Sequence, residues 1–327
     1  MTASGSTTTY GFHASHEQLP PDELLVALRH AAEVGFTAGM CSDHFAPWSE
    51  RQGHSGYAWA WLGAALATTA LPMGVVTAPG QRYHPAITAQ AAATLEQMHP
   101  GRFWLALGSG QALNEHITGR PWPRKDLRNA RLRECVDVIR ALLAGEEVSH
   151  DGLVTVDRAQ LWTVPEVPPL LVGAAISVGT ARWCAEWADG LITVNQPVDK
   201  LREMIDAYRG AGGRGKLHLQ VHLSYDPDEA RAEEIAYDQW RSNCFPPPVS
   251  WDLDRPELFD VVSESVSMEQ LRSVVHISSD LGKHTAQLAE YAALGFDEIA
   301  VHHVGQEQEG FVDAFGAKVL PQLVDAA

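Results

Sequence analysis

The sequence predicts an α/β fold, a closed (β/α)8 TIM barrel, and two observations support this prediction. Short apolar runs that end in polar or glycine residues alternate with longer segments of helical period about eight times along the 327 residues, which is typical of a parallel sheet covered by helices. No G-x-G-x-x-G motif follows the first predicted strand, so the alternative, an open doubly wound sheet, is disfavoured.

The predicted strands and helices follow each other in order. The strand segments are residues 10–12, 36–44, 71–79, 102–110, 169–175, 189–195, 217–225 and 297–305. The helix segments are residues 21–34, 85–99, 127–145, 178–188, 198–212 and 282–296, with one more helix at the end of the chain. The first helix is typical, because Leu24, Leu28 and Ala31 share one face and Gly35 ends it.

No linker or low-complexity tract divides the chain, so we expect a single domain over residues 1–327. The stretch "WRSNCFPPPVSWDLDRPE" breaks the β-α rhythm. We interpret it as an insertion at the C-terminal mouth of the barrel, around residues 240–265.

Composition excludes several classes of partner. The net charge is −17 and no Lys/Arg-rich run interrupts it, which argues against nucleic acid and, more weakly, against anionic membrane surfaces. No run of 18 apolar residues and no basic leader is present, so we expect a cytoplasmic protein that does not enter a membrane. The cysteines stand far apart without a CxxC pair, which disfavours structural zinc and disulfides and predicts reduced thiols: Cys41, Cys135, Cys184 and Cys244.

Catalytic groups of a barrel lie on the loops that follow the carboxyl ends of its strands. This rule selects residues 13–17, 43–48, 77–83, 108–115, 174–179, 195–196 and 302–303. His44 follows the second strand in "CSDHF", where an imidazole could accept a proton from an alcohol or hold a substrate oxygen, or could simply form a local hydrogen bond. The spacing of the histidines and acids near it lacks an HxH followed by a helical HxxxH, so no metal site is predicted.

Three further residues of the selected loops each allow a functional and a structural interpretation. Asp43 could orient His44 or bind a cofactor, or it could cap a helix. Trp48 could form a flat wall against a planar ring, or it could be a core residue. Glu17 could move a proton at the barrel mouth, or it could cap the first helix.

Two glycine-containing turns could bind a ligand through backbone amides, although both could also be ordinary turns. "GSGQALNE" (residues 108–115) follows the fourth strand, where glycine allows close approach of the backbone. "GAAISVGTARWCAEWADG" begins with small residues that lead into a helix, whose start could bind a phosphate.

Several motifs together resemble a known family. "ASHEQ", "SDHFAPW", "RYHPAITAQAAATL", "GSGQALNE" and "LRECVDVIRALLAG" resemble the F420-dependent glucose-6-phosphate dehydrogenase branch of the luciferase-like superfamily, from Gly11 to the final helix. The resemblance implies a barrel that is usually a homodimer. It also implies that His44 is the base, that Trp48 lies beside the cofactor ring, that Glu17 is the acid of the first-strand motif and that Asp43 contacts the cofactor. A non-prolyl cis peptide between Val75 and Val76 would back the ring.

The chain departs from that branch at three places. Gln111 stands where the family has a proton-donating Glu, and an amide can form a hydrogen bond but cannot deliver a proton. The family binds the phosphate of its sugar substrate with two lysines and an arginine. These basic residues would fall at Pro197, near Ser273 and at about Glu309, where this sequence has neutral or acidic residues. We therefore expect a substrate other than glucose 6-phosphate. The Gly-Gly turn is replaced at Ile176 and Ser177, which resembles FMN-binding relatives, so FMN is favoured over F420 as the cofactor.

The sequence thus predicts a flavin- or F420-dependent oxidoreductase that transfers a hydride between the cofactor and a small organic substrate, an alcohol, carbonyl compound or activated double bond. An FMN-dependent monooxygenase that uses molecular oxygen is the enzymatic alternative, and a non-catalytic flavin-binding protein is the alternative of another class. The expected catalytic residues are His44, Trp48, Glu17 and Gln111. The expected cofactor contacts are Asp43, Val75, Val76, Ala78, Gly110, Gln111, Asn114, Ala174, Ala175, Ile176, Ser177 and Gly179.

Overall fold

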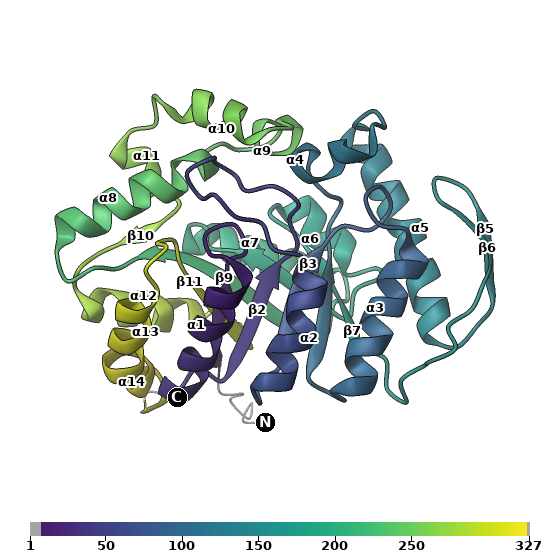
Figure 1. Cartoon of the computed structure of the whole chain (residues 1–327), viewed down its shortest axis with the longest axis horizontal. Helices are drawn as coiled ribbons and strands as arrows, with labels where there is room; N and C mark the ends of the chain where they lie inside the picture. The colour runs from purple at the N-terminus through teal and green to yellow at the C-terminus, as the bar shows by residue number, and fades with distance from the viewer. Residues whose placement is uncertain (1–7, 326–327) are drawn as a thin grey trace.

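The computed structural model describes residues 8–325 and contains a closed barrel of parallel strands (Figure 1). The sheet order runs β9-β11-β1-β2-β3-β4-β7-β8, and β8 pairs with β9 to close the ring. The predicted (β/α)8 barrel is therefore confirmed, and each predicted strand segment contains or overlaps one barrel strand. These strands are β1 (Thr9–Ala14), β2 (Ala38–Ser42), β3 (Met73–Thr77), β4 (Phe103–Leu107), β7 (Leu170–Ala174), β8 (Gly190–Val194), β9 (Lys216–Ser224) and β11 (Glu298–His303).

Helices surround the barrel. They are α1 (Pro21–Val34), α2 (Ala58–Thr68), α3 (Pro85–Met98), α5 (Lys125–Leu143), α6 (Val178–Cys184), α7 (Val198–Gly210), α12 (Leu281–Ala292), α13 (Glu309–Ala314), the π-helical turn η3 (Phe315–Val319) and α14 (Leu320–Asp325). Helix α1 has the predicted bounds, and Gly35 ends it with a left-handed φ of 115°. Sequence periodicity missed α2, because "AWAWLGAALAT" is apolar on nearly every face and lacks a side-chain cap at its start.

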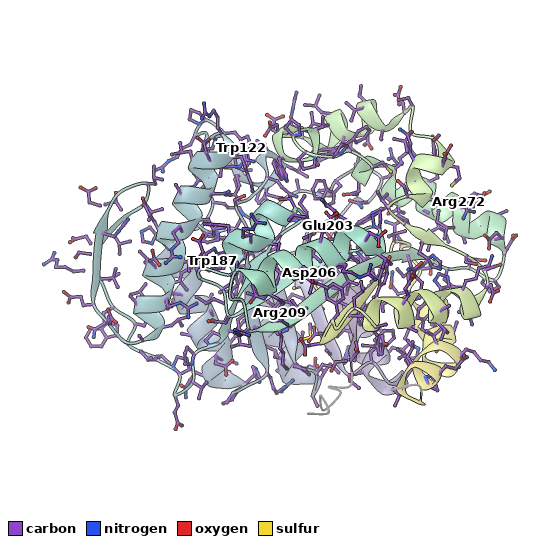
Figure 2. The ribbon with its side chains drawn as sticks, turned by 180° about the vertical axis from the view of Figure 1, so that it is seen from behind. Trp122, Trp187, Glu203, Asp206, Arg209 and Arg272 are labelled. Carbon is purple, nitrogen blue, oxygen red and sulfur yellow. The ribbon has the colours of Figure 1, made fainter. Side chains whose placement is uncertain are left out.

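Helix α7 illustrates how a surface helix is placed. Leu201 and Met204 are buried, whereas Glu203 and Asp206 are exposed. Figure 2 shows these two acids on the helix that crosses the back of the molecule. The apolar stripe packs inward and the charged face meets water, as the helical period predicts.

Inward- and outward-facing residues of the strands form separate clusters. Met40, Trp104 and Ile192 are buried together in a cluster inside the barrel. Val75 belongs to the larger core between the strands and the helices, whereas its neighbour Val76 packs with the inner cluster. This alternation follows from the two-residue period of a strand and decides which residues can reach a site inside the barrel.

Two additions to the barrel were not predicted as strands. A hairpin of β5 (Val148–Asp151) and β6 (Thr155–Ala159) projects beyond α5 at the edge of the molecule (Figure 1). The short strand β10 (His276–Ile277) pairs with the carboxyl end of β9.

A segment of short helices lies over the carboxyl ends of the strands, along the top of Figure 1. Residues 241–272, here called the mouth segment, contain η2 (Arg241–Asn243), α9 (Val249–Asp252), α10 (Pro256–Ser263) and α11 (Met268–Arg272), and they follow α8 (Glu229–Trp240). Asp260 holds this segment to the loop after β2, since it accepts hydrogen bonds from Ser49 Oγ at 2.7 Å and from the Glu50 amide at 3.0 Å. The mouth segment therefore contributes side chains to the end of the barrel where the site was predicted.

The sequence also led to expectations about membrane segments, a leader and the cysteines. Among residues 8–325, no helix combines the length and the apolar character that crossing a membrane requires. The expected lack of a leader concerns the N-terminus, whose first seven residues lie outside the described part. All four cysteines are free, as predicted.

Candidate active site

Two chambers adjoin at the carboxyl end of the barrel. The outer chamber is lined by the carboxyl ends of β2, β3, β4, β7 and β8, by the segments that follow them, and by Trp251 of the mouth segment. Among its other residues are Asp43, Val76, Gln111, Ala174 and Thr180. The inner chamber is lined by β1, β9, β11 and the mouth segment, with Glu17, Trp48, Gln220, His222, Trp240 and His302 among its residues. Both chambers share Ser42, His44, Ile176, Val194 and Gln220. A ligand in one chamber would therefore meet a ligand in the other beside His44.

His44 is held by Glu17. The His44 Nδ1 atom contacts a carboxylate oxygen of Glu17, which is buried and also accepts a hydrogen bond from Ser15 Oγ at 2.9 Å. Burial raises the pKa of Glu17, but the charge of His44 and its hydrogen bond outweigh burial and lower the pKa to about 2. Trp48 packs edge-on against the imidazole, with ring centroids 5.4 Å apart. With Nδ1 engaged by Glu17, His44 keeps Nε2 for a substrate.

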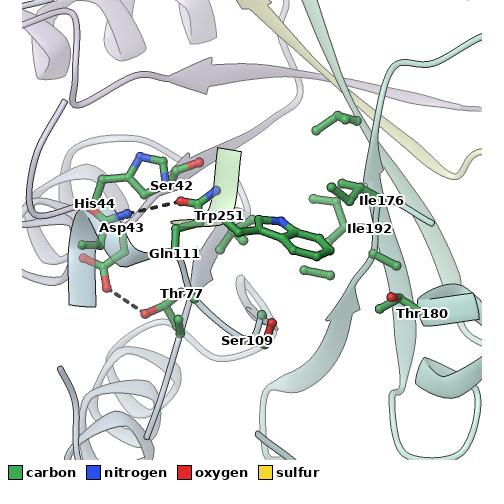
Figure 3. Close-up of a pocket in the computed structure, with 18 of the residues that line it drawn as sticks. Ser42, Asp43, His44, Thr77, Ser109, Gln111, Ile176, Thr180, Ile192 and Trp251 are labelled. Carbon is green, nitrogen blue, oxygen red and sulfur yellow. Dashed lines mark hydrogen bonds between the residues drawn. The ribbon is translucent and has the colours of Figure 1, made fainter. Parts of the chain in front are cut away.

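Asp43 makes no hydrogen bond to His44, so it does not have the orienting role that was one of its three possible roles. Its carboxylate accepts hydrogen bonds from Thr77 Oγ1 at 2.7 Å and from Tyr83 Oη at 3.1 Å, and it lies 3.4 Å from Arg82 Nη2. Burial, together with the charge of Asp43, raises the pKa of the Tyr83 hydroxyl. Asp43 therefore lines the outer chamber as a carboxylate that is held by Thr77 and Tyr83 and lies beside the positive charge of Arg82 (Figure 3).

A chain of hydrogen bonds fixes which end of the Gln111 amide is available. Asn114 Oδ1 accepts from the backbone amides of Phe45 at 2.8 Å and Ala46 at 3.3 Å, so Asn114 Nδ2 is left as a donor. That donor binds Gln111 Oε1 at 3.3 Å. Gln111 consequently keeps its Nε2 hydrogens for a ligand of the outer chamber, opposite Ile176 and Ile192 in Figure 3.

Lys125 supplies positive charge to the outer chamber. Its Nζ donates to Ser109 Oγ at 2.6 Å and lies 4.6 Å from the ring of Trp251. Burial, reinforced by nearby Arg128, lowers the pKa of Lys125 to about 8. The contacts of Lys125 Nζ are to the Ser109 hydroxyl and the Trp251 ring, neither of which neutralises its charge, so Lys125 is suited to an anionic part of a ligand.

Most of the predicted cofactor contacts line the outer chamber, namely Asp43, Val76, Ala78, Gly110, Gln111, Asn114, Ala174, Ala175 and Ile176. Three do not line either chamber. Val75 points into the core outside the barrel, because its strand neighbour Val76 points inward. Ser177 caps α6, where its Oγ accepts from the Thr180 amide at 3.3 Å, and Gly179 lies within that helix with open space beside it.

The expected cis peptide between Val75 and Val76 is wrong. Strand β3 pairs without a bulge to both neighbours, with Val75 opposite Cys41 and Leu105. Within residues 8–325 the one cis peptide bond is Pro247-Pro248. A regular ladder on both sides leaves β3 in an ordinary trans conformation, since a cis bond would interrupt it.

Several residues of the chambers were missed. Lys125, Trp240 and Trp251 lie outside the strand ends, on helices that only the fold brings to the site, whereas Arg82 lies in the selected range 77–83 but was not named as a site residue. Gln220 and His222 could have been found, because "LHLQVHLSY" alternates polar and apolar residues and such alternation places one set inside a barrel.

Comparisons with known proteins place the chain in a family. A family model described as "Luciferase-like monooxygenase" matches residues 2–298, and the chain belongs to this family. An F420-dependent glucose-6-phosphate dehydrogenase of Beutenbergia cavernae is 34% identical over 326 residues, covering 96% of each protein. One of the same name from Kribbella flavida is 35% identical over 328 residues, covering 96% of this chain and 97% of the relative.

Solved structures agree with this assignment. An F420-dependent secondary alcohol dehydrogenase, in complex with an F420-acetone adduct, has a TM-score of 0.90 and 28% identity, covering 97% of this chain and 99% of that one. The F420-dependent tetrahydromethanopterin reductase of Methanopyrus kandleri, at 19% identity and a TM-score of 0.76, shows the same fold. The chain is therefore an oxidoreductase of the luciferase-like family, in which F420-dependent dehydrogenases and monooxygenases both occur. The preference for FMN finds no support in these relatives.

Proposed function

We propose that this protein is an F420-dependent dehydrogenase that interconverts a neutral alcohol and its carbonyl compound. The observation that carries the proposal is the Glu17-supported His44 at the junction of the two chambers. The outer chamber would hold the cofactor and the inner chamber the substrate, so that the base stands where they meet.

The residues of the outer chamber fit a planar, three-ring cofactor with an anionic tail. Val76, Ala78 and Ile192 offer apolar contacts to the ring, and Gln111 Nε2 offers a hydrogen-bond donor to its edge. Lys125 offers a charge to a phosphate group. Flavin and F420 share these parts, and we favour F420 because the most similar relatives named above depend on it.

F420 held in the outer chamber would supply the two-electron acceptor for the hydride of the alcohol carbon. His44 Nε2 would take the hydroxyl proton as the hydride leaves, so that a carbonyl compound and an imidazolium remain. Glu17 would stabilise this imidazolium, because the charge of His44 and its hydrogen bond lower the pKa of the Glu17 carboxyl and so favour the carboxylate beside it. In the reverse direction the same imidazolium would return the proton to the carbonyl oxygen.

A phosphorylated substrate would find no cation in the inner chamber. None of the described residues that line it is a lysine or an arginine, and its carboxylate is Glu17. A doubly charged phosphate would lose its hydration there without a charged partner. We therefore propose that glucose 6-phosphate, which names several relatives, is not the substrate of this chain.

The test compares two cofactors and two directions. Purified protein is titrated with F420 and with FMN, and F420 reduction is followed by the loss of its visible absorbance with propan-2-ol, or its recovery with acetone. We expect tighter binding of F420 and turnover in both directions. Tighter binding of FMN, with oxygen consumption when the flavin is reduced, would replace the proposal by a monooxygenase. Binding of either cofactor without any turnover would favour a flavin-binding protein.

We also propose a homodimer, as the family resemblance implies, and a cytoplasmic location, as the composition implies. Sedimentation velocity of the purified chain tests the first. A monomer at micromolar concentration would contradict it.

A further inference from the structure

The floor of the inner chamber is made of uncharged hydrogen-bonding groups. Gln220 Nε2 lies 3.4 Å from His13 Nε2, 3.2 Å from His222 Nε2 and 3.2 Å from His302 Nδ1. These four residues come from β1, β9 and β11, and all of them line the inner chamber. We call them the neutral floor.

Burial keeps the three imidazoles of the floor neutral. It lowers the pKa of His13 and of His222 to about 3, and it lowers the pKa of His302 well below its usual value. Within residues 8–325, no group of three or more His, Cys, Asp or Glu residues is arranged to hold a metal ion. The floor therefore offers donors and acceptors without charge.

The direction of the hydrogen bonds in the floor is determined. Gln18 Nε2 donates to the Val304 carbonyl, so Gln18 Oε1 faces His302 Nε2, which donates to it at 2.7 Å. A neutral imidazole that donates from Nε2 accepts at Nδ1. Gln220 must therefore present its NH₂ group to His302, which leaves Gln220 Oε1 on the other side of the amide, in a residue that lines both chambers.

The floor has more hydrogen-bonding capacity than it uses. Gln220 Nε2 carries two hydrogens but faces three imidazole nitrogens, so the most distant of them, His13 Nε2, is left without a full bond. His13 Nδ1 also lacks a protein partner, although the side chain is only 3% exposed. The Nδ1 atom of His13 is itself covered, so a ligand would meet the floor at Gln220 Oε1, a free acceptor in a residue that lines both chambers.

Aromatic residues face the same space. Trp240 lies 4.7 Å from His222 and 4.8 Å from His302, centroid to centroid, and Trp48 lies beside His44. Flat aromatic faces next to neutral hydrogen-bonding groups suit a molecule with C–H faces and several hydroxyl groups. A purely aliphatic alcohol would leave the floor unsatisfied, which costs binding energy.

We propose that the substrate is a neutral polyol or unphosphorylated sugar, and that Gln220 is a specificity-determining residue. One hydroxyl would react at His44, while a second would donate to Gln220 Oε1 and accept from the floor. This inference rests on the proposed function for the identity of the reaction, but the binding of a polyol to the floor is independent of the cofactor.

The first experiment measures specificity. F420 reduction by the loaded enzyme is compared with butane-2,3-diol, sorbitol and propan-2-ol. We expect kcat/KM for at least one polyol to exceed kcat/KM for propan-2-ol by about tenfold or more. The Gln220→Leu exchange should lower the ratio of these two kcat/KM values about tenfold, since one buried hydrogen bond to the polyol is lost. The ratio for Gln220→Asn should lie between those of the wild type and Gln220→Leu. The control Gln90→Leu, on the exposed face of α3, should keep the wild-type ratio. A wild-type preference for propan-2-ol, or an unchanged ratio in Gln220→Leu, would overturn the inference.

The second experiment does not need turnover. Sorbitol is titrated into the cofactor-free protein, and the fluorescence of Trp48 and Trp240 reports occupancy of the chamber. We expect saturable quenching that Gln220→Leu weakens about tenfold, with thermal melting to show that the variant is folded. If no alcohol reduces F420 but sorbitol still binds through Gln220, the proposed function fails and the polyol site stands. If propan-2-ol is oxidised but sorbitol neither binds nor reacts, the proposed function stands and the polyol site fails.

Discussion

The two chambers differ in the charged side chains that line them. In the outer chamber, buried or half-buried charged groups are present and most are paired, as Asp43 is with Arg82. In the inner chamber, Glu17 is engaged by His44, and none of the other described lining residues is an acid, a lysine or an arginine. An anionic cofactor needs the first environment, whereas a neutral substrate is bound with less desolvation in the second. The contrast explains how one barrel end could separate two ligands of different charge.

The largest expected effect is that of removing the base between the chambers. His44→Ala should lower kcat by roughly 10²- to 10⁴-fold, because general base catalysis is lost, and should leave the dissociation constant of F420 nearly unchanged. Steady-state kinetics and F420 titration measure the two quantities. His54→Ala, in the same loop but lining neither chamber, is the matched control. If His44→Ala weakened cofactor binding and turnover equally, His44 would belong to the outer chamber alone.

Removal of the Lys125 charge from the outer chamber should weaken binding of the cofactor and leave binding of the substrate unchanged. Lys125→Ala is expected to weaken F420 binding by about 10- to 100-fold, as loss of a charged hydrogen bond does, with KM for the alcohol little changed. Because the pKa of Lys125 lies at about 8, wild-type affinity should fall as pH rises through that value, and the variant should lack this dependence. Lys200→Ala is the control, because this lysine of α7 pairs with Glu203 and lines neither chamber. A parallel pH profile in Lys125→Ala would contradict the assignment.

The neutral imidazoles of the inner chamber should make the fold sensitive to acid. The pKa of His13 and His222 falls from 6.5 to about 3 on burial, so between these values the unfolded chain binds more protons than the folded one. Their contribution to stability is complete above pH 6.5 and is lost progressively as pH falls toward about 3. Urea unfolding over this pH range should show that the free energy of unfolding falls less steeply with decreasing pH in His13→Gln than in wild type. His54→Gln should follow the wild-type curve, and an equal slope in His13→Gln would show that His13 is not neutral when folded.

The smallest effect is expected for the edge of the cofactor ring. Gln111→Leu should weaken F420 binding by about three- to tenfold, since it removes one neutral hydrogen-bond donor. Gln111→Glu tests whether the acid of the resembling family improves turnover in this site. Unchanged F420 affinity in Gln111→Leu, measured by fluorescence titration, would mean that the amide does not face the ring.

The strand pattern made much of the site predictable. His44 and Gln111 follow the carboxyl ends of apolar strands and Ala174 is the last residue of one, and parallel strands in a barrel bring these ends together. The same rule could not decide between Val75 and Val76, because that choice depends on the register in which β3 enters the barrel. Resemblance to relatives did not help there either, since it implied a cis bond that β3 does not have.

The sequence by itself determined the barrel, the end of it that holds the site, and the residues with the chemistry for proton transfer, because these depend on local periodicity and residue type. Only the tertiary structure decided which of them act together. Glu17, rather than the adjacent Asp43, holds His44, and Lys125 and Trp251 reach the outer chamber from a helix start and from the mouth segment. The direction of the Gln220 amide likewise follows from hydrogen bonds to residues more than 80 positions away in the chain. Such contacts arise from packing between distant segments, for which a local pattern carries no signal.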